Sequence, residues 1–207
     1  MMRLVRDGGP RPLAAPGLLP LPGRPRRGRA FRVLVLGGAR SGKSVTAERM
    51  LAGRDQVEYV ACGLTADDSD PSWAERLRLH QERRPAHWTT RETLDLETVL
   101  GAEPAAVPVL MDCLSTWLAG VMDECGLWTG QARADKELAT RVDGLMHAWR
   151  STSRVVVAVS NEVGLGVVPA TASGVRFRDE LGRLNARVAA DCEQVWLCTA
   201  GIARRLR

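Results

Sequence analysis

The sequence predicts an α/β fold, in which a mostly parallel sheet is flanked by helices within a single domain. Strand-like apolar runs alternate with helical patterns from residue 31 onward, and a glycine-rich loop stands between the first strand and the first helix. Such alternation is typical of parallel sheets whose strands are joined by right-handed helical crossovers. The 207 residues are enough for one such domain with a full core, and short for two.

The strands are predicted from apolar runs bounded by turn residues. The run at 155–160 is the most apolar, and the run at 107–111 is also of the buried type. The predicted strands are residues 31–36, 57–61, 107–111, 155–160 and 195–199, and the run at 195–199 is expected to be the last strand.

The helices are predicted from apolar periodicity and from residues that begin or end helices. Asp70 and Ser72 are alternative caps for a helix that runs to about Arg83 and is stopped by Pro85. The predicted helices are residues 43–52, 72–83, 94–100, 113–125, 131–152 and 171–191.

A complete G-x-x-x-x-G-K-[ST] phosphate loop follows the first strand and leads into the first helix. Two of its glycines let the backbone curl so that its N–H groups face a phosphate. Lys43 is placed to reach the β and γ phosphate oxygens, and the Ser44 hydroxyl to ligate Mg²⁺. A chance glycine-rich turn is the alternative, but the strand and helix around the loop favour nucleotide binding and a P-loop NTPase-like, RecA-like fold. The expected nucleotide contacts are Gly37, Gly38, Ala39, Arg40, Ser41, Gly42, Lys43 and Ser44.

Asp112 is the candidate metal residue, because it follows a buried strand. Open parallel sheets bind ligands beyond the carboxyl ends of their strands, and a carboxylate at this position holds the Mg²⁺ shell of a phosphate-loop site. The alternative is that Asp112 caps the helix that begins at residue 113.

For four other charged or titratable residues, the sequence allows either a functional or a structural role. Glu162 follows the strand at 155–160, so it could orient a nucleophile or Mg²⁺, or pair with an arginine of the next helix. Arg176 and Arg183 lie on one helix face and could bind phosphate or pair with acids. His80, beside several arginines, could be a surface or packing residue, or a nucleophile that accepts a phosphoryl or nucleotidyl group.

The positive charge is concentrated in the first 30 residues. The chain carries +5 overall, and residues 1–30 carry +6 from seven arginines and one aspartate, so residues 31–207 sum to −1. The same segment holds six of the eleven prolines, and we expect a disordered extension that precedes the domain at 31–207. It could be an inert leader or a misplaced start, a nucleic-acid or membrane contact through its basic cluster, or, least favoured, a secretory signal.

The cysteines and the apolar runs favour a cytoplasmic protein. The five cysteines are odd in number and show no C-x-x-C spacing, which suits reduced thiols better than disulfides or zinc. The sequence contains no run of 18 apolar residues and so predicts no membrane span.

Five stretches together resemble one family, the bifunctional adenosylcobinamide kinase / adenosylcobinamide-phosphate guanylyltransferases of cobalamin synthesis. They spread over nearly all of residues 31–207, and their order is highly specific. The stretches are GGARSGKS at 37–44, HQERRPAHWTTRE at 80–92, LMDCLS at 110–115, SNEVGLGVVP at 160–169 and RFRDELGRLN at 176–185.

The resemblance implies two reactions and a set of site residues. The first reaction phosphorylates the aminopropanol hydroxyl of adenosylcobinamide from ATP or GTP, and the second transfers GMP from GTP to that phosphate through a histidine, here His80. The resemblance also implies a cyclic homotrimer. Besides the phosphate loop, the nucleotide contacts that it implies are Ala61, Cys62, Gly63, Gln81, Glu82, Arg83, Arg84, Glu92 and Asp112.

Three other function classes compete with this interpretation. One is a kinase-only enzyme in which His80 is structural. Another is an ATPase that acts on nucleic acid, against which the net charge of −1 on residues 31–207 and the scarcity of Phe and Tyr both count. The last is a non-catalytic nucleotide switch. We therefore expect corrinoid and nucleotide partners and no stable nucleic-acid partner.

Overall fold

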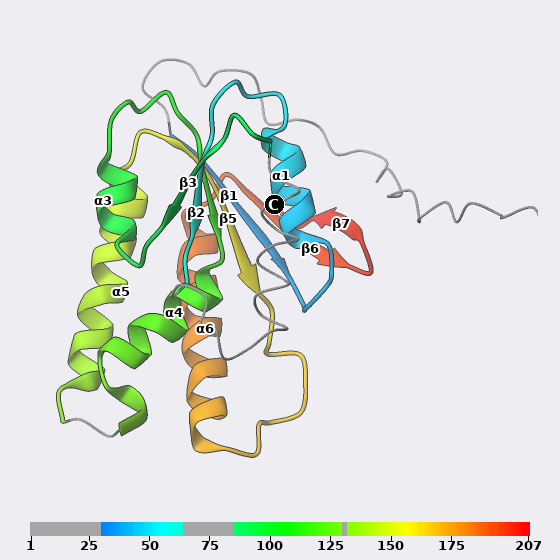
Figure 1. The fold of residues 1–207 in the computed structure, drawn as a ribbon. Helices are drawn as coiled ribbons and strands as arrows, with labels where there is room; N and C mark the ends of the chain where they lie inside the picture. The colour runs from blue at the N-terminus through cyan, green and yellow to red at the C-terminus, as the bar shows by residue number, and fades with distance from the viewer. Residues whose placement is uncertain (1–29, 64–84, 130–131) are drawn as a thin grey trace, which may run out of the picture.

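A single seven-stranded sheet organises residues 30–63, 85–129 and 132–207, the part of the chain that the computed structural model describes (Figure 1). The strand order is β3-β2-β4-β5-β1-β6-β7, and every pairing is parallel except β6 with β7. The strands are β1 (Phe31–Gly37), β2 (Glu58–Ala61), β3 (Thr89–Glu92), β4 (Val109–Asp112), β5 (Val155–Asn161), β6 (Gln194–Thr199) and β7 (Ile202–Arg205).

The helices cover both faces of this sheet. In Figure 1, α1 stands on one side and the other α-helices on the opposite side. The helical segments are α1 (Lys43–Leu51), α3 (Leu96–Gly101), α4 (Leu114–Glu124), the short 3₁₀ helix η1 (Leu127–Thr129), α5 (Ala134–Ser151) and α6 (Ala172–Ala190).

Alternation along β1 divides the core into two layers. Leu34 and Leu36 face a cluster formed with α3, α4, α5 and α6, whereas Val33 and Val35 face a second cluster formed with α1. Successive side chains of a strand point to opposite faces, so a strand buried on both sides reads as an unbroken apolar run. The predicted mostly parallel α/β architecture is thus confirmed.

Two strands were not predicted. The edge strand β3 has the sequence Thr-Thr-Arg-Glu and is exposed at every position, so it carries no apolar signal. The prediction that the run at 195–199 is the last strand is wrong, because the chain turns at Ala200-Gly201 and returns as the antiparallel strand β7. The helix predicted at 72–83 lies outside the described residues.

A buried ion pair fixes the amino edge of the sheet. Arg154 is 2% exposed, and its guanidinium group donates to Oε2 of Glu58 (2.7 Å) and to the carbonyl oxygens of Val99 (2.8 Å) and Val107 (2.9 Å). Every nitrogen of the group therefore has an acceptor, which is the condition under which a buried charge is tolerated. The contacts join the residue before β5 to β2, to α3 and to the turn before β4.

Each of the five cysteines is free and buried. None of them is paired in a disulfide, and the redox state of the thiols stays a prediction. Among the described residues, no helix has the length and apolar character that a membrane crossing requires.

Candidate active site

Several residues predicted for the site lie along the carboxyl edge of the sheet. In the strand register, Gly37 lies beside Asn161, and Ala61 lies between Asp112 and Glu92 on its two neighbouring strands. The phosphate loop leaves β1 at the same edge. Ligands of open parallel sheets bind beyond this edge, so the fold brings the predicted residues to one side of the molecule.

The phosphate loop has the backbone conformation that its glycines predict. Gly42 has φ of 93° and immediately precedes α1, and Arg40 also has a positive φ, of 56°. A Cβ on Gly37 would lie 2.6 Å from the carbonyl oxygen of Cys198, and also against the Ser41 hydroxyl, so only glycine fits there. Lys43 donates to the carbonyl oxygen of Gly38 over 3.2 Å, which places its ammonium group across the loop.

The turn between β6 and β7 braces this loop. The Gly201 N–H donates to the carbonyl oxygen of Ser41 over 3.0 Å, and a Cβ on Gly42 would lie 3.2 Å from the Cα of Gly201. Ala200 and Gly201 have φ of 50° and 80°, the positive values of a tight two-residue hairpin turn. The C-terminal hairpin thus belongs to the structure of the phosphate site.

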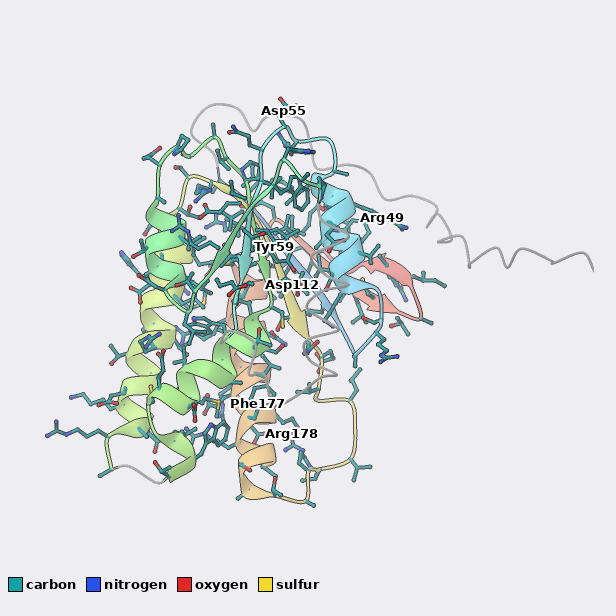
Figure 2. The ribbon with its side chains drawn as sticks, viewed as in Figure 1. Arg49, Asp55, Tyr59, Asp112, Phe177 and Arg178 are labelled. Atoms are coloured by element: carbon teal, nitrogen blue, oxygen red, sulfur yellow. The ribbon has the colours of Figure 1, made fainter. Side chains whose placement is uncertain are left out.

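Asp112 ends β4, and its carboxylate is oriented by a buried tyrosine. The Tyr59 hydroxyl donates to Oδ2 of Asp112 over 2.9 Å, and Figure 2 labels the two residues close together on the sheet. The residue that caps α4 is Cys113, whose main-chain N–H donates to the Thr116 hydroxyl. The alternative of Asp112 as the helix cap is therefore wrong.

Two cysteines stand directly behind the edge. The Cys62 N–H donates to the carbonyl oxygen of Asp112 over 3.3 Å, and its thiol donates to the carbonyl oxygen of Val60. Burial raises the pKa of the Cys62 thiol well above its usual range, and the nearby Cys113 and Asp112 raise it further. The thiol of Cys62 therefore stays neutral and is a weak donor rather than a nucleophile.

A hydrogen-bonded group of amides and hydroxyls supports the end of β5. Asn161 Nδ2 donates to Ser115 Oγ (2.8 Å), which also contacts the Cys113 sulfur (2.8 Å). Asn185 Nδ2 donates to the carbonyl oxygen of Asn161 (3.0 Å), and the Ser160 hydroxyl donates to Asn185 Oδ1 (2.7 Å). These contacts hold β5, α4 and α6 together next to the carboxyl edge of the sheet.

The remaining charged candidates have partners of their own. The Glu162 carboxylate accepts a hydrogen bond from the Gly164 N–H (2.8 Å), and the Glu162 N–H donates to the carbonyl oxygen of Gly37 (3.1 Å). Arg176 pairs with Asp135 and Glu180, and Arg183 pairs with Glu180. These ion pairs correspond to the acid-pairing alternative for the two arginines, and their contact with substrate stays a prediction.

Not all predicted residues are brought together. His80, Gln81, Glu82, Arg83 and Arg84 lie outside the described residues. Glu92 ends β3, which is four strands away from β1, so it lies about 19 Å from the phosphate loop at the usual strand spacing. Glu92 and Lys43 can therefore contact opposite ends of a nucleotide but not the same phosphate.

Two residues of the site were missed in the sequence. Tyr59 lies in an apolar strand, and only its hydroxyl hinted at a buried polar partner. Asn161 stands beside Glu162 in the sequence and is neutral, so no charge marks it as a candidate. The turn at Ala200-Gly201 was also missed, since an Ala-Gly pair is a weaker hairpin signal than Asn-Gly or Asp-Gly.

The comparisons with known proteins agree with this geometry. The family model described as cobinamide kinase / cobinamide phosphate guanyltransferase matches residues 33–206. The chain is 35% identical over 183 residues to the bifunctional adenosylcobalamin biosynthesis protein CobU of Salmonella typhimurium, which covers 84% of this chain and 99% of that protein. It is 38% identical over 180 residues to the bifunctional adenosylcobalamin biosynthesis protein CobP of Pseudomonas aeruginosa, which covers 86% of this chain and 98% of that protein.

A solved structure shows the same fold at much lower sequence identity. It is a prototypical ATPase from the type III secretion system of pathogenic bacteria, with a TM-score of 0.51 at 11% identity, over 82% of this chain and 51% of that chain. At this identity the likeness concerns the fold alone. The sequence matches and the fold together establish that the chain belongs to the cobinamide kinase / cobinamide phosphate guanyltransferase family.

Proposed function

We propose that the chain carries out both reactions of its family, cobinamide phosphorylation and guanylyl transfer, at the carboxyl edge of one sheet. The observation that carries the proposal is the alignment of the phosphate loop with Asp112 at that edge, in a chain whose residues 33–206 match the family. The substrates are adenosylcobinamide with ATP or GTP in the first step, and the resulting phosphate with GTP in the second.

In the kinase step, the cobinamide hydroxyl attacks the γ-phosphorus and releases its proton to water, the bond to the β-phosphate oxygen breaks, and the nucleoside diphosphate leaves. The backbone N–H groups of residues 37–44 hold the β-phosphate, and Lys43 offsets charge on the transferring oxygens. The 3.2 Å contact of Lys43 with Gly38 supports this role, since the ammonium group already lies across the loop that would receive the phosphates.

A Mg²⁺ ion fits the residues present. Ser44 stands at the first turn of α1, and Asp112 supplies one oriented carboxylate. No cluster of three or more metal-ligating side chains occurs among the described residues, and Mg²⁺ at nucleotide sites needs none, because it keeps several waters and uses one or two protein oxygens besides the phosphates. Once bound, the ion would neutralise charge that develops on the phosphate oxygens.

In the guanylyl step, we propose that His80 Nε2 or Nδ1 attacks the α-phosphorus of GTP and releases pyrophosphate. The cobinamide phosphate oxygen then attacks the same phosphorus and releases His80. Arg83 and Arg84 are the cations proposed to offset phosphoryl charge. The proposed guanine nucleotide contacts are Ala61, Cys62, Gly63, Gln81, Glu82, Glu92 and Asp112, of which those on β2, β3 and β4 lie along one edge.

Labelled nucleotide tests this assignment. Incubation with α-labelled GTP and Mg²⁺ should give a labelled protein whose bond is labile in acid and stable in base, as expected for a phosphoramidate, and γ-labelled GTP should leave no label there. His80→Ala should lose the label and the guanylyl transfer but keep part of the kinase activity, because phosphoryl transfer to a hydroxyl needs the loop and positioning rather than this nucleophile. A His80→Ala protein that still takes the label would refute the assignment. A wild type that phosphorylates cobinamide but never takes the label would establish a kinase-only enzyme.

We further propose a cytoplasmic homotrimer in which residues 1–30 are dispensable. The resemblance described above supports the trimer, and the five free buried cysteines support a reducing compartment. Light scattering of the purified protein should give three times the chain mass of 22.5 kDa. A chain that begins at residue 31 should match the full chain in melting temperature and in both activities; a melting temperature several degrees lower would show that the segment docks on the domain.

A further inference from the structure

Two buried polar atoms at the carboxyl edge of the sheet have no partner among the described residues, the Ser41 hydroxyl of the phosphate loop and a side-chain atom of Asn161. The side-chain oxygen of Asn161, Oδ1, is buried and accepts no hydrogen bond. In this orientation the Nδ2 of the amide donates to Ser115, and the main chain of Asn161 is held by Asn185. A buried acceptor without a partner is costly, and such atoms in native proteins call for an explanation, a bound group among them.

The position of Asn161 narrows what that group can be. Strand β5 lies between β1 and β4, so Asn161 stands between the phosphate loop and the strand that ends in Asp112. Phosphate groups of a bound nucleotide carry no hydrogen to donate at neutral pH, and they cannot satisfy an acceptor. The group must offer an O–H or N–H, and among the reactants of the kinase step the nucleophile itself is a hydroxyl.

The loop that follows Asn161 has a second unusual property. Three of its apolar side chains are largely exposed: Leu165 at 86%, Val167 at 94% and Val168 at 64%. The loop is nevertheless anchored at its start through Gly37, next to the phosphate loop, and at its end, where Pro169 packs against the first turn of α6. Contiguous exposed apolar side chains on an anchored loop mark an interaction site more often than isolated ones do.

The two properties fit the same ligand. The phosphates and the ribose of a nucleotide are polar, and the phosphates have their own loop, so these parts of the nucleotide do not explain the apolar side chains. A corrinoid is a large macrocycle edged with methyl and methylene groups, and cobinamide carries its reactive hydroxyl on a side chain. The exposed apolar side chains of the loop suit the macrocycle. The acceptor of Asn161, at the start of the same loop, suits the hydroxyl. Both groups belong to one molecule.

We propose that residues 161–168 form the corrinoid subsite, in which Asn161 Oδ1 accepts the hydrogen bond of the attacking hydroxyl and Leu165, Val167 and Val168 contact the macrocycle. The assignment rests on the proposed function. Asn161 is neutral and takes no proton from the hydroxyl; it fixes the direction of the O–H bond, so that a lone pair of the oxygen faces the γ-phosphorus. Asn161 and the three loop residues then set the affinity for corrinoid, and the phosphate loop sets the affinity for nucleotide.

The loop is tested with a Leu165→Ser/Val167→Ser variant of the full chain and a matched control, Leu206→Ser. Leu206 is 57% exposed and lies after β7, outside this loop. We expect the KM for cobinamide to rise about tenfold or more in the loop variant, since each lost apolar contact weakens binding. We expect nucleotide affinity, melting temperature and oligomeric state to match those of the control. An unchanged KM would overturn the subsite, and a changed oligomeric state would show that the loop instead contacts a second copy of the chain.

The acceptor is tested with Asn161→Leu, which has a similar volume and no acceptor, and Asn161→Asp, which keeps an oxygen at the same place. With cobinamide and ATP, Asn161→Leu should lose turnover by about a hundredfold, as expected for a misdirected nucleophile, while nucleotide affinity stays unchanged. Asn161→Asp should recover a large part of the loss. If both variants lose turnover equally, the acceptor role is wrong. Asn161→Leu could instead raise the Mg²⁺ concentration needed for half-maximal turnover and leave turnover at saturating Mg²⁺ unchanged. In that case Asn161 Oδ1 accepts a hydrogen bond from a metal-bound water, and the hydroxyl assignment is wrong.

Failure of the proposed function is distinguishable from failure of the subsite. A wild-type protein that neither binds nor phosphorylates cobinamide would overturn both. An active wild-type protein whose loop and Asn161 variants match it would overturn the subsite alone.

Discussion

The hydroxyl of Tyr59 donates to Oδ2 of Asp112 over 2.9 Å, between the neighbouring strands β2 and β4. Tyr59 is 1% exposed, so the ring is fixed in the core and its hydroxyl holds one oxygen of the carboxylate in a set direction. Partners of this kind orient residues that bind metals, and their loss is felt in metal affinity.

Replacement of Tyr59 by Phe should therefore act mainly on Mg²⁺. The ring packing is kept and the hydroxyl is lost, so we expect the free energy of unfolding to fall by only about 1 kcal/mol. The Mg²⁺ concentration for half-maximal kinase turnover should rise about tenfold. A Mg²⁺ titration of turnover measures this, with Asp112→Asn as the reference variant that loses most turnover at any Mg²⁺ concentration. An unchanged titration midpoint would show that the contact is structural only.

Lys43→Ala should abolish both activities and weaken nucleoside triphosphate binding, because the ammonium group across the loop is lost. The sequence offers a matched control, since its only other lysine, Lys136, is exposed on α5. Lys136→Ala should keep wild-type affinity and turnover. Calorimetric titration with ATP and GTP, together with kinase assays, checks both variants. Equal affinities for the two would show that the loop is merely a turn.

Gly201→Ala should lower both stability and nucleotide affinity. Gly201 has φ of 80°, where an alanine is strained by about 1 kcal/mol. Relief of this strain would pull its N–H away from the carbonyl oxygen of Ser41, and the phosphate loop would lose its brace. Gly53→Ala is the control, because a Cβ there meets no atom within 4 Å. The brace is disproved if Gly201→Ala loses stability but binds nucleotide as well as Gly53→Ala does.

Arg154→Leu should be the most destabilising of these changes. It leaves Glu58 buried without its buried partner and removes the donors to two carbonyl oxygens, so we expect a loss of about 3–5 kcal/mol. Arg150 is the control, since its pair with Asp191 is half exposed, and Arg150→Leu should cost at most about 1 kcal/mol. Urea denaturation measures both values. A similar small loss for the two variants would mean that the buried pair contributes little.

The stability of the protein should fall with pH in the alkaline range. Burial raises the pKa of the Cys192 thiol from its ordinary value near 9 to about 12. Above pH 9 the unfolded chain loses this proton and the folded chain keeps it, so the free energy of unfolding decreases as pH rises from about 9 to about 12. Urea denaturation at several pH values should show a shallower decrease in Cys192→Ala. Identical slopes would show that Cys192 does not contribute.

Much of the fold could be predicted from the sequence because the central strands are buried on both faces. β1, β4 and β5 read as apolar runs for that reason, and the glycines of the phosphate loop mark where the backbone must curl. The strand β3 could not be predicted, because an exposed edge strand is specified by its neighbour rather than by its own side chains. The antiparallel strand β7 depends on a two-residue turn, and the alanine in that turn is a weak hairpin signal in the sequence.

The candidate site was predictable only where a local motif dictates it. The phosphate loop and Asp112 have chemistry that is visible in a few adjacent residues. The contact of Tyr59 with Asp112 joins positions 53 residues apart in the chain, and that of Gly201 with Ser41 joins positions still farther apart. Such contacts follow from strand order and register, which a linear pattern does not contain. The roles of residues 80–84 are predictions from family resemblance.

The brace of the phosphate loop has a consequence for the order of synthesis. Gly37, Ser41 and Gly42 leave the ribosome early. Cys198, which lies beside Gly37, and Gly201, which contacts Ser41 and Gly42, are made much later. A nascent chain that stops before β6 lacks both the strand beside β1 and the turn that supports the loop. A bound nucleotide therefore cannot stabilise the domain early in its synthesis. The chain binds nucleotide only after β6 and the turn that follows it have been made and the sheet is complete.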